Sequence, residues 1–177
     1  MKKQTRKLVL SALFTATGII LPFITMQIPR IGNMLLPMHI PVLLCGFICG
    51  APYGFTVGLI VPLLRSVLVG MPVMVPAAVT MAPELAIYGL VTGLFYERLK
   101  SVKIGIYISL ISAMILGRIA WGLASLGVFS LLGNRFTWKI FVTNGFINAI
   151  LGIIIQLILI PMVIKGLETK KGAYVSL

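Results

Sequence analysis

The segment from Ala77 to Tyr96 is apolar over about 20 residues, the length that an α-helix needs to cross the hydrocarbon core of a bilayer. It carries Glu84, one of only three acidic residues in the chain. An ionised side chain inside a bilayer costs on the order of 2–4 kcal/mol or more, so it is normally paired and often functional. Arg65 and Arg118 also lie inside apolar runs. We therefore expect a fold that brings these three charges together.

The composition is that of a membrane protein. Of its 177 residues, 59% are hydrophobic and 10% are charged, whereas soluble domains are about half apolar and a quarter charged. The net charge of +12 could suggest nucleic acid, but the cations cluster at the ends of apolar runs, so no nucleic-acid partner is expected. We predict an all-α membrane protein, a six-transmembrane-helix bundle with a short second helix and apolar extracellular lid loops. It would form a single integral membrane domain over residues 1–177.

Six spans are predicted, at approximately 8–26, 38–51, 54–71, 77–97, 104–131 and 139–165. The second is short for a full crossing and is interrupted by Pro41, so it is expected to be tilted or partly re-entrant. A tight, uncharged turn is expected at Pro52–Gly54, immediately after it.

The distribution of basic residues predicts that both termini are cytoplasmic. With that orientation, ten Lys and Arg residues lie on the cytoplasmic side: Lys2, Lys3, Arg6, Lys7, Arg98, Lys100, Lys103, Lys165, Lys170 and Lys171. Three lie in outer loops: Arg30, Arg135 and Lys139. A re-entrant second span would invert everything that follows it.

The sequence does not suggest an enzyme, a metal site or a cofactor. It has no G-x-x-x-x-G-K-[ST] loop for a nucleotide. One histidine and one membrane-embedded acid are too few for a metal-dependent hydrolase. Cys45 and Cys49 lie four residues apart in one apolar segment, and we interpret them as packing residues.

The three membrane-embedded charges are predicted to lie at one depth. Because a helix rises 1.5 Å per residue, Arg65, Glu84 and Arg118 are each placed roughly 10 Å below the outer surface of the ~30 Å core. Tyr88 follows Glu84 by four residues and Trp121 follows Arg118 by three, so each charge has an aromatic side chain on its own helix face.

A polar row on the last span reaches a similar depth. Asn144 and Asn148 lie four residues apart and share a face that continues through Gly152 to Gln156. Together with the charges, they predict a polar, aromatic-lined pocket in the outer half of the bundle for a small polar organic ligand. The predicted contacts are Asn33, His39, Arg65, Glu84, Tyr88, Arg118, Trp121, Asn144 and Asn148.

A structural explanation of the same residues stays open. Glu84 could simply neutralise Arg118 or Arg65, with the asparagines joining helices, although two arginines then face one glutamate. His39, expected at the lip of the second helix, could cap that helix, contact a ligand or do neither. The outer loops 27–39, 70–76 and 132–138 are apolar, and they could lie in the headgroup region or cover the pocket as lids.

The first span carries Ala12 and Ala16, small residues whose spacing lets another helix approach closely. With its basic N-terminus and predicted six helices, the chain resembles the S component, the substrate-binding membrane subunit, of an energy-coupling factor (ECF) vitamin transporter. The segments 34–44, 63–65 and 83–89 are similar to the branch that includes pantothenate-type members.

The resemblance implies a bacterial plasma-membrane subunit that binds a vitamin from outside with high affinity. It implies partners, namely a transmembrane coupling subunit that Ala12 and Ala16 would meet, and two ATPase subunits that hydrolyse ATP. The whole subunit would reorient in the membrane to deliver its ligand, and the first outer loop would act as a lid.

Pantothenate is the first choice of substrate because its carboxylate suits one of the two buried arginines, and its hydroxyls and amide suit the asparagines and Tyr88. A pyridoxine-type vitamin or a pyrimidine precursor is the alternative, with Glu84 and Trp121 then the more important contacts. A stand-alone carrier or an intramembrane enzyme is a more distant alternative.

Overall fold

A computed structural model of the chain describes residues 2–25 and 34–175, and these residues form helices and short connections. The main helices are α1 (Lys2–Thr25), α3 (His39–Cys49), α4 (Ala51–Val69), α5 (Val79–Leu99), α6 (Gly105–Leu131) and α8 (Ile150–Val175). Shorter elements precede two of them: η1 (Met74–Ala78) leads into α5, and α7 (Trp138–Val142) and η2 (Thr143–Ile147) lead into α8.

The predicted helical membrane bundle is confirmed. Within the described residues, five helical stretches are long and apolar enough to cross a bilayer: Lys3–Ile24, Ala51–Val69, Met74–Leu99, Gly105–Leu131 and Trp138–Leu167. The remaining apolar helix, α3, is the predicted short second helix. Both cysteines are buried in or at the end of α3 as free thiols.

The predicted turn at Pro52–Gly54 is wrong. The chain reverses two residues earlier, at Gly50, whose φ of 98° favours a glycine. Pro52 lies in the first turn of α4, where its missing N–H costs no helical hydrogen bond. Likewise, Pro41 does not interrupt α3, because the helix begins at His39 and the proline falls in its first turn.

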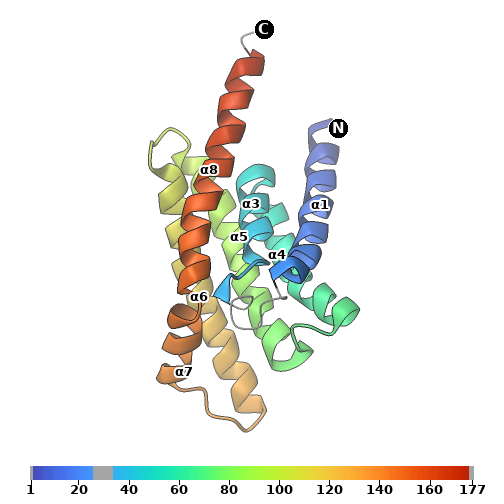
Figure 1. Cartoon of the computed structure of the whole chain (residues 1–177), viewed down its shortest axis with the longest axis vertical. Coiled ribbons are helices and arrows are strands. Elements are labelled where there is room, and N and C mark those ends of the chain that lie inside the picture. The colour runs from blue at the N-terminus through green and yellow to red at the C-terminus, as the bar shows by residue number, and fades with distance from the viewer. Residues whose placement is uncertain (1, 26–33, 176–177) are drawn as a thin grey trace.

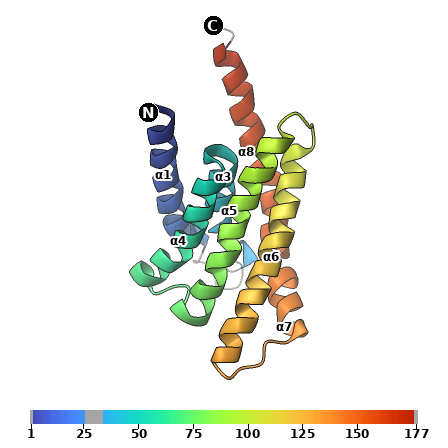
Figure 2. The same cartoon turned by 180° about the vertical axis from the view of Figure 1, so that it is seen from behind.

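The helices pack in two layers (Figures 1 and 2). Helices α4, α5 and α6 lie side by side in one layer, and α1, α3 and α8 form the other, with α3 in the middle. The start of α1 and the end of α8 lie at the same end of the bundle, with the α5–α6 connection, while the α6–α7 connection lies at the opposite end. This agrees with both termini on one side of the membrane; that this side is cytoplasmic stays a prediction.

Helix α3 spans only about half of the bundle, since 11 residues rise about 16 Å against a core of about 30 Å. It ends near the start of α1, because a Cβ atom on Gly50 would lie 3.7 Å from Nζ of Lys7. Before α4 begins, the chain has therefore returned to the end of the bundle where α1 starts. The later helices keep their predicted directions relative to α1. The start of α3, at His39, lies deep in the bundle.

Glycines let α4 and α5 pack backbone against backbone. A Cβ atom on Gly89 would lie 2.1 Å from the carbonyl oxygen of Gly54, and one on Gly58 would lie 2.2 Å from that of Leu85. Small residues permit this close approach in membrane helices, where lipid supplies no hydrophobic drive for helix association. This contact fixes α5, which carries Glu84 on another face.

Candidate functional site

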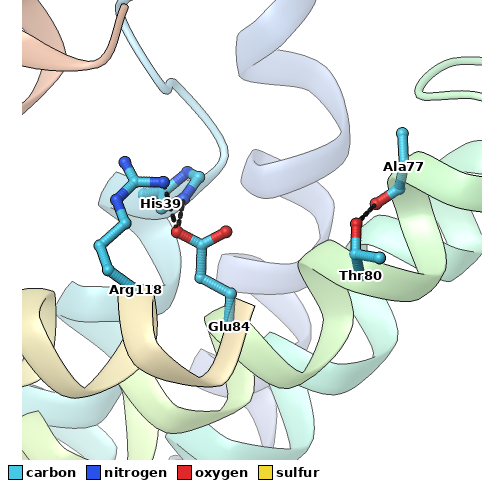
Figure 3. Close-up of polar contacts among 5 residues, drawn as sticks. All are labelled: His39, Ala77, Thr80, Glu84 and Arg118. Atoms are coloured by element: carbon cyan, nitrogen blue, oxygen red, sulfur yellow. Dashed lines mark hydrogen bonds and ion pairs between the residues drawn. The ribbon is translucent and has the colours of Figure 1, made fainter. Parts of the chain in front are cut away.

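Three helices each contribute one polar side chain to a buried cluster (Figure 3). The Oε1 atom of Glu84, on α5, lies 2.7 Å from Nη1 of Arg118 on α6 and 3.5 Å from Nε2 of His39 at the start of α3. The three residues are 1%, 5% and 1% exposed, respectively. The predicted pairing of the buried acid with an arginine is present, and pairing offsets the cost of burying either charge alone.

The packing around the cluster explains why these side chains meet. Tyr88 lies one turn after Glu84 and is buried, with its ring 5.2 Å from that of His39 in an edge-on arrangement. Gly117, next to Arg118, leaves room for the tyrosine ring. A Cβ atom at this position would lie 2.0 Å from Cε1 of Tyr88, which is too close for any side chain. The absence of a side chain at Gly117 thus brings α6 close enough for its arginine to reach Glu84.

The position of His39 corrects an expectation. The histidine was expected at the lip of the second helix, but it is almost fully buried because α3 begins in the interior of the bundle. Its partners are Glu84 and Tyr88.

The arginine of the cluster is only partly satisfied. Within the described part of the chain, Nε and Nη2 of Arg118 are buried without a hydrogen-bond partner, as are both ring nitrogens of His39 and Oε1 of Glu84, whose contacts with Arg118 and His39 are ion-pair contacts. Buried polar groups almost always have partners, and each orphaned group costs about 1–3 kcal/mol. One N–H on Nε and one on Nη2 point the same way, an arrangement that matches the two oxygens of a carboxylate. The cluster can therefore bind an anionic acceptor.

Two further buried polar groups were missed by the sequence analysis as site candidates. Ser125 on α6 and Gln156 on α8 are 0% and 1% exposed, and Oγ of the serine and Nε2 of the glutamine have no partner among the described residues. Ser125 follows Arg118 by seven residues, two helical turns, so the spacing was a usable signal. Gln156 was noted only as the inner end of the asparagine row.

Trp121 lies beside the arginine, as its helix spacing predicted. A Cβ atom on Gly145 of η2 would lie 3.6 Å from Cζ3 of Trp121 and 3.9 Å from Cδ of Arg118. The indole stacks on Phe141 at 6.0 Å between ring centroids and meets Phe136 edge-on at 5.7 Å. These rings form an aromatic wall next to Arg118.

The structure does not bring the asparagines into the cluster. Asn144 and Asn148 are exposed, and Nδ2 of Asn148 donates to Oδ1 of Asn144 at 3.1 Å. Asn144 lies in the π-helical turn η2 and Asn148 is the residue that caps its C-terminal end, where the Asn148 N–H donates to the carbonyl oxygen of Thr143, 2.8 Å away. Further along the same row, a Cβ atom on Gly152 would lie 2.8 Å from the carbonyl oxygen of Met34. Ligand contact by the two asparagines stays a prediction.

Arg65 is buried but points elsewhere. Its Nε donates to the carbonyl oxygen of Ile19 at 3.2 Å, its Nη1 donates to that of Met71, and its guanidinium lies 5.5 Å from the ring of Phe23. The sequence predicted that three charged side chains come together. Glu84 and Arg118 do so, and Arg65 does not join them. The depth argument located Arg65 along its helix axis but not around it, and its side chain faces α1.

Three other predicted positions remain, namely Asn33, Ala12 and Ala16. Asn33, with most of the first outer loop, lies outside the described residues. Ala12 and Ala16 are exposed on α1, whose opposite face packs inward through Gly18 against Val61. The described residues contain no group of three or more His, Cys, Asp or Glu side chains that could hold a metal ion.

Comparison with known proteins gives one family. A family model described as "ECF transporter, substrate-specific component" matches residues 6–164. Neither the curated proteins nor the solved structures gave a match.

Proposed function

Since the chain belongs to the family of ECF transporter substrate-specific components, we propose that it binds a small carboxylate-bearing compound of vitamin size at Arg118. Pantothenate is the first candidate. The transported compound would enter from outside the cell, in the outer half of the bundle, and the protein would lie in a bacterial plasma membrane with both termini cytoplasmic.

The observation that carries this proposal is the unpartnered edge of Arg118. Its Nη1 atom faces Glu84, whereas Nε and Nη2 have no acceptor among the described residues. A ligand carboxylate accepting both N–H groups would satisfy this edge. Ser125 and Gln156 would be candidate partners for hydroxyl and amide groups, which pantothenate also carries.

A pyridoxine-type vitamin or a pyrimidine precursor is the second candidate, favoured by the aromatic wall at Trp121. Such ligands would use Glu84 as an acceptor. Its Oε1 atom lies 2.7 Å from Nη1 of Arg118 and 3.5 Å from Nε2 of His39 and has no hydrogen-bond partner among the described residues, so it could accept from such a ligand.

Family membership also implies partners in the ECF module. We propose that Ala12 and Ala16 contact the transmembrane coupling subunit, which is joined by two ATPase subunits. Their exposure on α1 supports this role, because another helix can approach small exposed side chains closely. Delivery would follow from reorientation of the whole subunit in the membrane.

The test combines native mass spectrometry of the purified protein with calorimetric titration of pantothenate, pyridoxine and the aminopyrimidine precursor of thiamin. We expect one-to-one binding of pantothenate. Arg118→Lys keeps the charge but loses the planar fork, so its affinity should fall about 100-fold. Arg65→Lys, the matched control on α4, should change affinity less than about threefold. Binding of pyridoxine but not pantothenate would support the second candidate instead.

A further inference from the structure

A carboxylate beside an anion-binding arginine requires an explanation. Glu84 lies 2.7 Å from Nη1 of Arg118, and both side chains are shielded from solvent. A neighbouring negative charge weakens the attraction of an arginine for any anionic ligand, and little solvent is present to screen it.

The geometry separates the two roles of the guanidinium. Glu84 faces Nη1, while Nε and Nη2 have no partner within residues 2–25 and 34–175. Glu84 therefore does not occupy the edge that a ligand carboxylate would use. Glu84 orients the guanidinium of Arg118 and compensates its charge. It leaves the Nε and Nη2 donors available to a ligand.

The charges of the cluster then limit the ligand. Arg118 contributes one positive charge, Glu84 one negative charge, and His39 either none or one positive charge, so the cluster sums to zero or plus one. A ligand group with one negative charge brings the sum to minus one or zero. A group with two brings it to minus two or minus one, which is one more uncompensated negative charge than a monoanion leaves in the same buried site, and each such charge is unfavourable.

Two other described groups do not supply the missing charge. Tyr88, whose ring lies 5.2 Å from that of His39, is a neutral polar residue, and the guanidinium of Arg65 donates to backbone carbonyls of Ile19 and Met71.

We infer that Glu84 is a specificity-determining residue that restricts the group bound at Arg118 to a single negative charge. The site would accept a carboxylate or sulfonate and reject a phosphate or phosphonate dianion. This inference rests on the proposed function, in which Arg118 binds the acidic group of the ligand.

The test uses three probes of one scaffold: pantothenate, its sulfonate analogue and its phosphonate analogue. Sulfonate and phosphonate are both tetrahedral, but at about pH 9 the phosphonate carries two charges, since the second proton of such groups is lost near neutral pH. Calorimetric titration of the purified protein should show the sulfonate binding at least about 100-fold more tightly than the phosphonate.

Variants then assign the discrimination to Glu84. Glu84→Gln keeps the shape and one acceptor oxygen for Arg118, and it should reduce the sulfonate-to-phosphonate ratio at least about tenfold while pantothenate still binds. Glu84→Asp keeps the charge and should keep the ratio. A test without variants is also available. At about pH 6 the phosphonate is largely a monoanion, so its affinity relative to the sulfonate should rise at least about tenfold.

The outcomes separate the two proposals. If pantothenate binds in an Arg118-dependent way but wild-type protein does not distinguish sulfonate from phosphonate, the inference about Glu84 is wrong and the proposed function stands. An unchanged ratio in folded Glu84→Gln, or no recovery at about pH 6, would equally overturn it. If neither pantothenate nor the sulfonate binds, the carboxylate ligand and this inference fail together.

Discussion

Arg65 of α4 donates its Nε–H to the carbonyl oxygen of Ile19 in α1, 3.2 Å away and 46 residues earlier in the chain. A second donor of the same guanidinium bonds the carbonyl of Met71, and Phe23 of α1 lies against its charged face at 5.5 Å. A buried cation thus joins α1 to α4 and to the connection that follows α4. Helix α1 is the element whose outward face carries the exposed alanines.

Replacing Arg65 should therefore affect stability more than ligand binding. Arg65→Met leaves buried carbonyl groups without this donor, at a cost of about 1–3 kcal/mol, which corresponds to several degrees in the thermal midpoint of a chain this size. Arg135→Met, at an exposed position in the α6–α7 connection, is the control. Scanning fluorimetry and calorimetry measure the two effects. Loss of ligand binding with an unchanged midpoint would return Arg65 to the binding site.

The Glu84–Arg118 pair should show strong coupling in a double-mutant cycle. Arg118→Met alone leaves the buried carboxylate of Glu84 without its cationic partner and should destabilise the protein by about 3–5 kcal/mol. Adding Glu84→Gln removes that charge, and it should restore most of the thermal stability but none of the pantothenate binding. If the double variant regains binding, the pair is only structural and the ligand binds elsewhere.

Gly145 offers a way to close the site without changing any charged group. Its missing side chain faces Trp121 and Arg118 at 3.6 and 3.9 Å, so Gly145→Phe should fill the space next to the guanidinium and reduce ligand affinity at least about tenfold. Gly127→Phe, on an open face of α6 with nothing within 4 Å, should bind as wild type. Equal affinities in the two variants would place the ligand away from η2.

The α4–α5 contact should be intolerant of a single methyl group. A Cβ atom on Gly89 would lie 2.1 Å from a backbone carbonyl oxygen, and backbone cannot move aside as a flexible side chain can. Gly89→Ala should cost at least about 1–3 kcal/mol. Gly166→Ala, where no described atom lies within 4 Å of the added methyl group, should be neutral or slightly stabilising. Thermal unfolding in detergent gives the comparison, and a stable Gly89→Ala protein would contradict the close packing.

The exposed alanines of α1 should matter for transport alone. Ala12→Leu combined with Ala16→Leu keeps the helix apolar but prevents close approach of a partner helix. Calorimetry should give wild-type ligand affinity, whereas uptake by cells that express the whole transporter should fall at least about tenfold. Gly127→Leu is the size-matched control on another exposed face. Normal uptake by the double variant would place the coupling surface elsewhere.

The buried charges illustrate how far the sequence could predict the site. A glutamate and two arginines inside apolar runs are conspicuous, and the cost of burying them required partners. Helix rise gave their approximate depth but not their direction around each axis. Close packing at Gly117 turned Arg118 toward Glu84, while the side chain of Arg65 was directed to α1.

Two buried uncharged residues were harder to predict. Ser125 and Gln156 resemble the isolated polar residues that many membrane helices use for packing, so only their burial without partners among the described residues marks them. His39 was placed at the wrong depth because apolar length indicates that a segment is helical but not where in the bundle the helix begins. The two asparagines lie in and at the end of a π-helical turn, whose wider spacing breaks the regular row.

The sequence by itself determined the class of fold, the approximate limits of the helices and the presence of a buried acid that needs a cation. These follow from local physical chemistry: apolar length, helical rise and the cost of charge in a low dielectric. Only the tertiary structure decided which arginine meets Glu84, which edge of the Arg118 guanidinium has no partner among the described residues, and which uncharged polar residues are buried. Those depend on the rotation and close approach of helices far apart in sequence, which packing of the whole bundle sets.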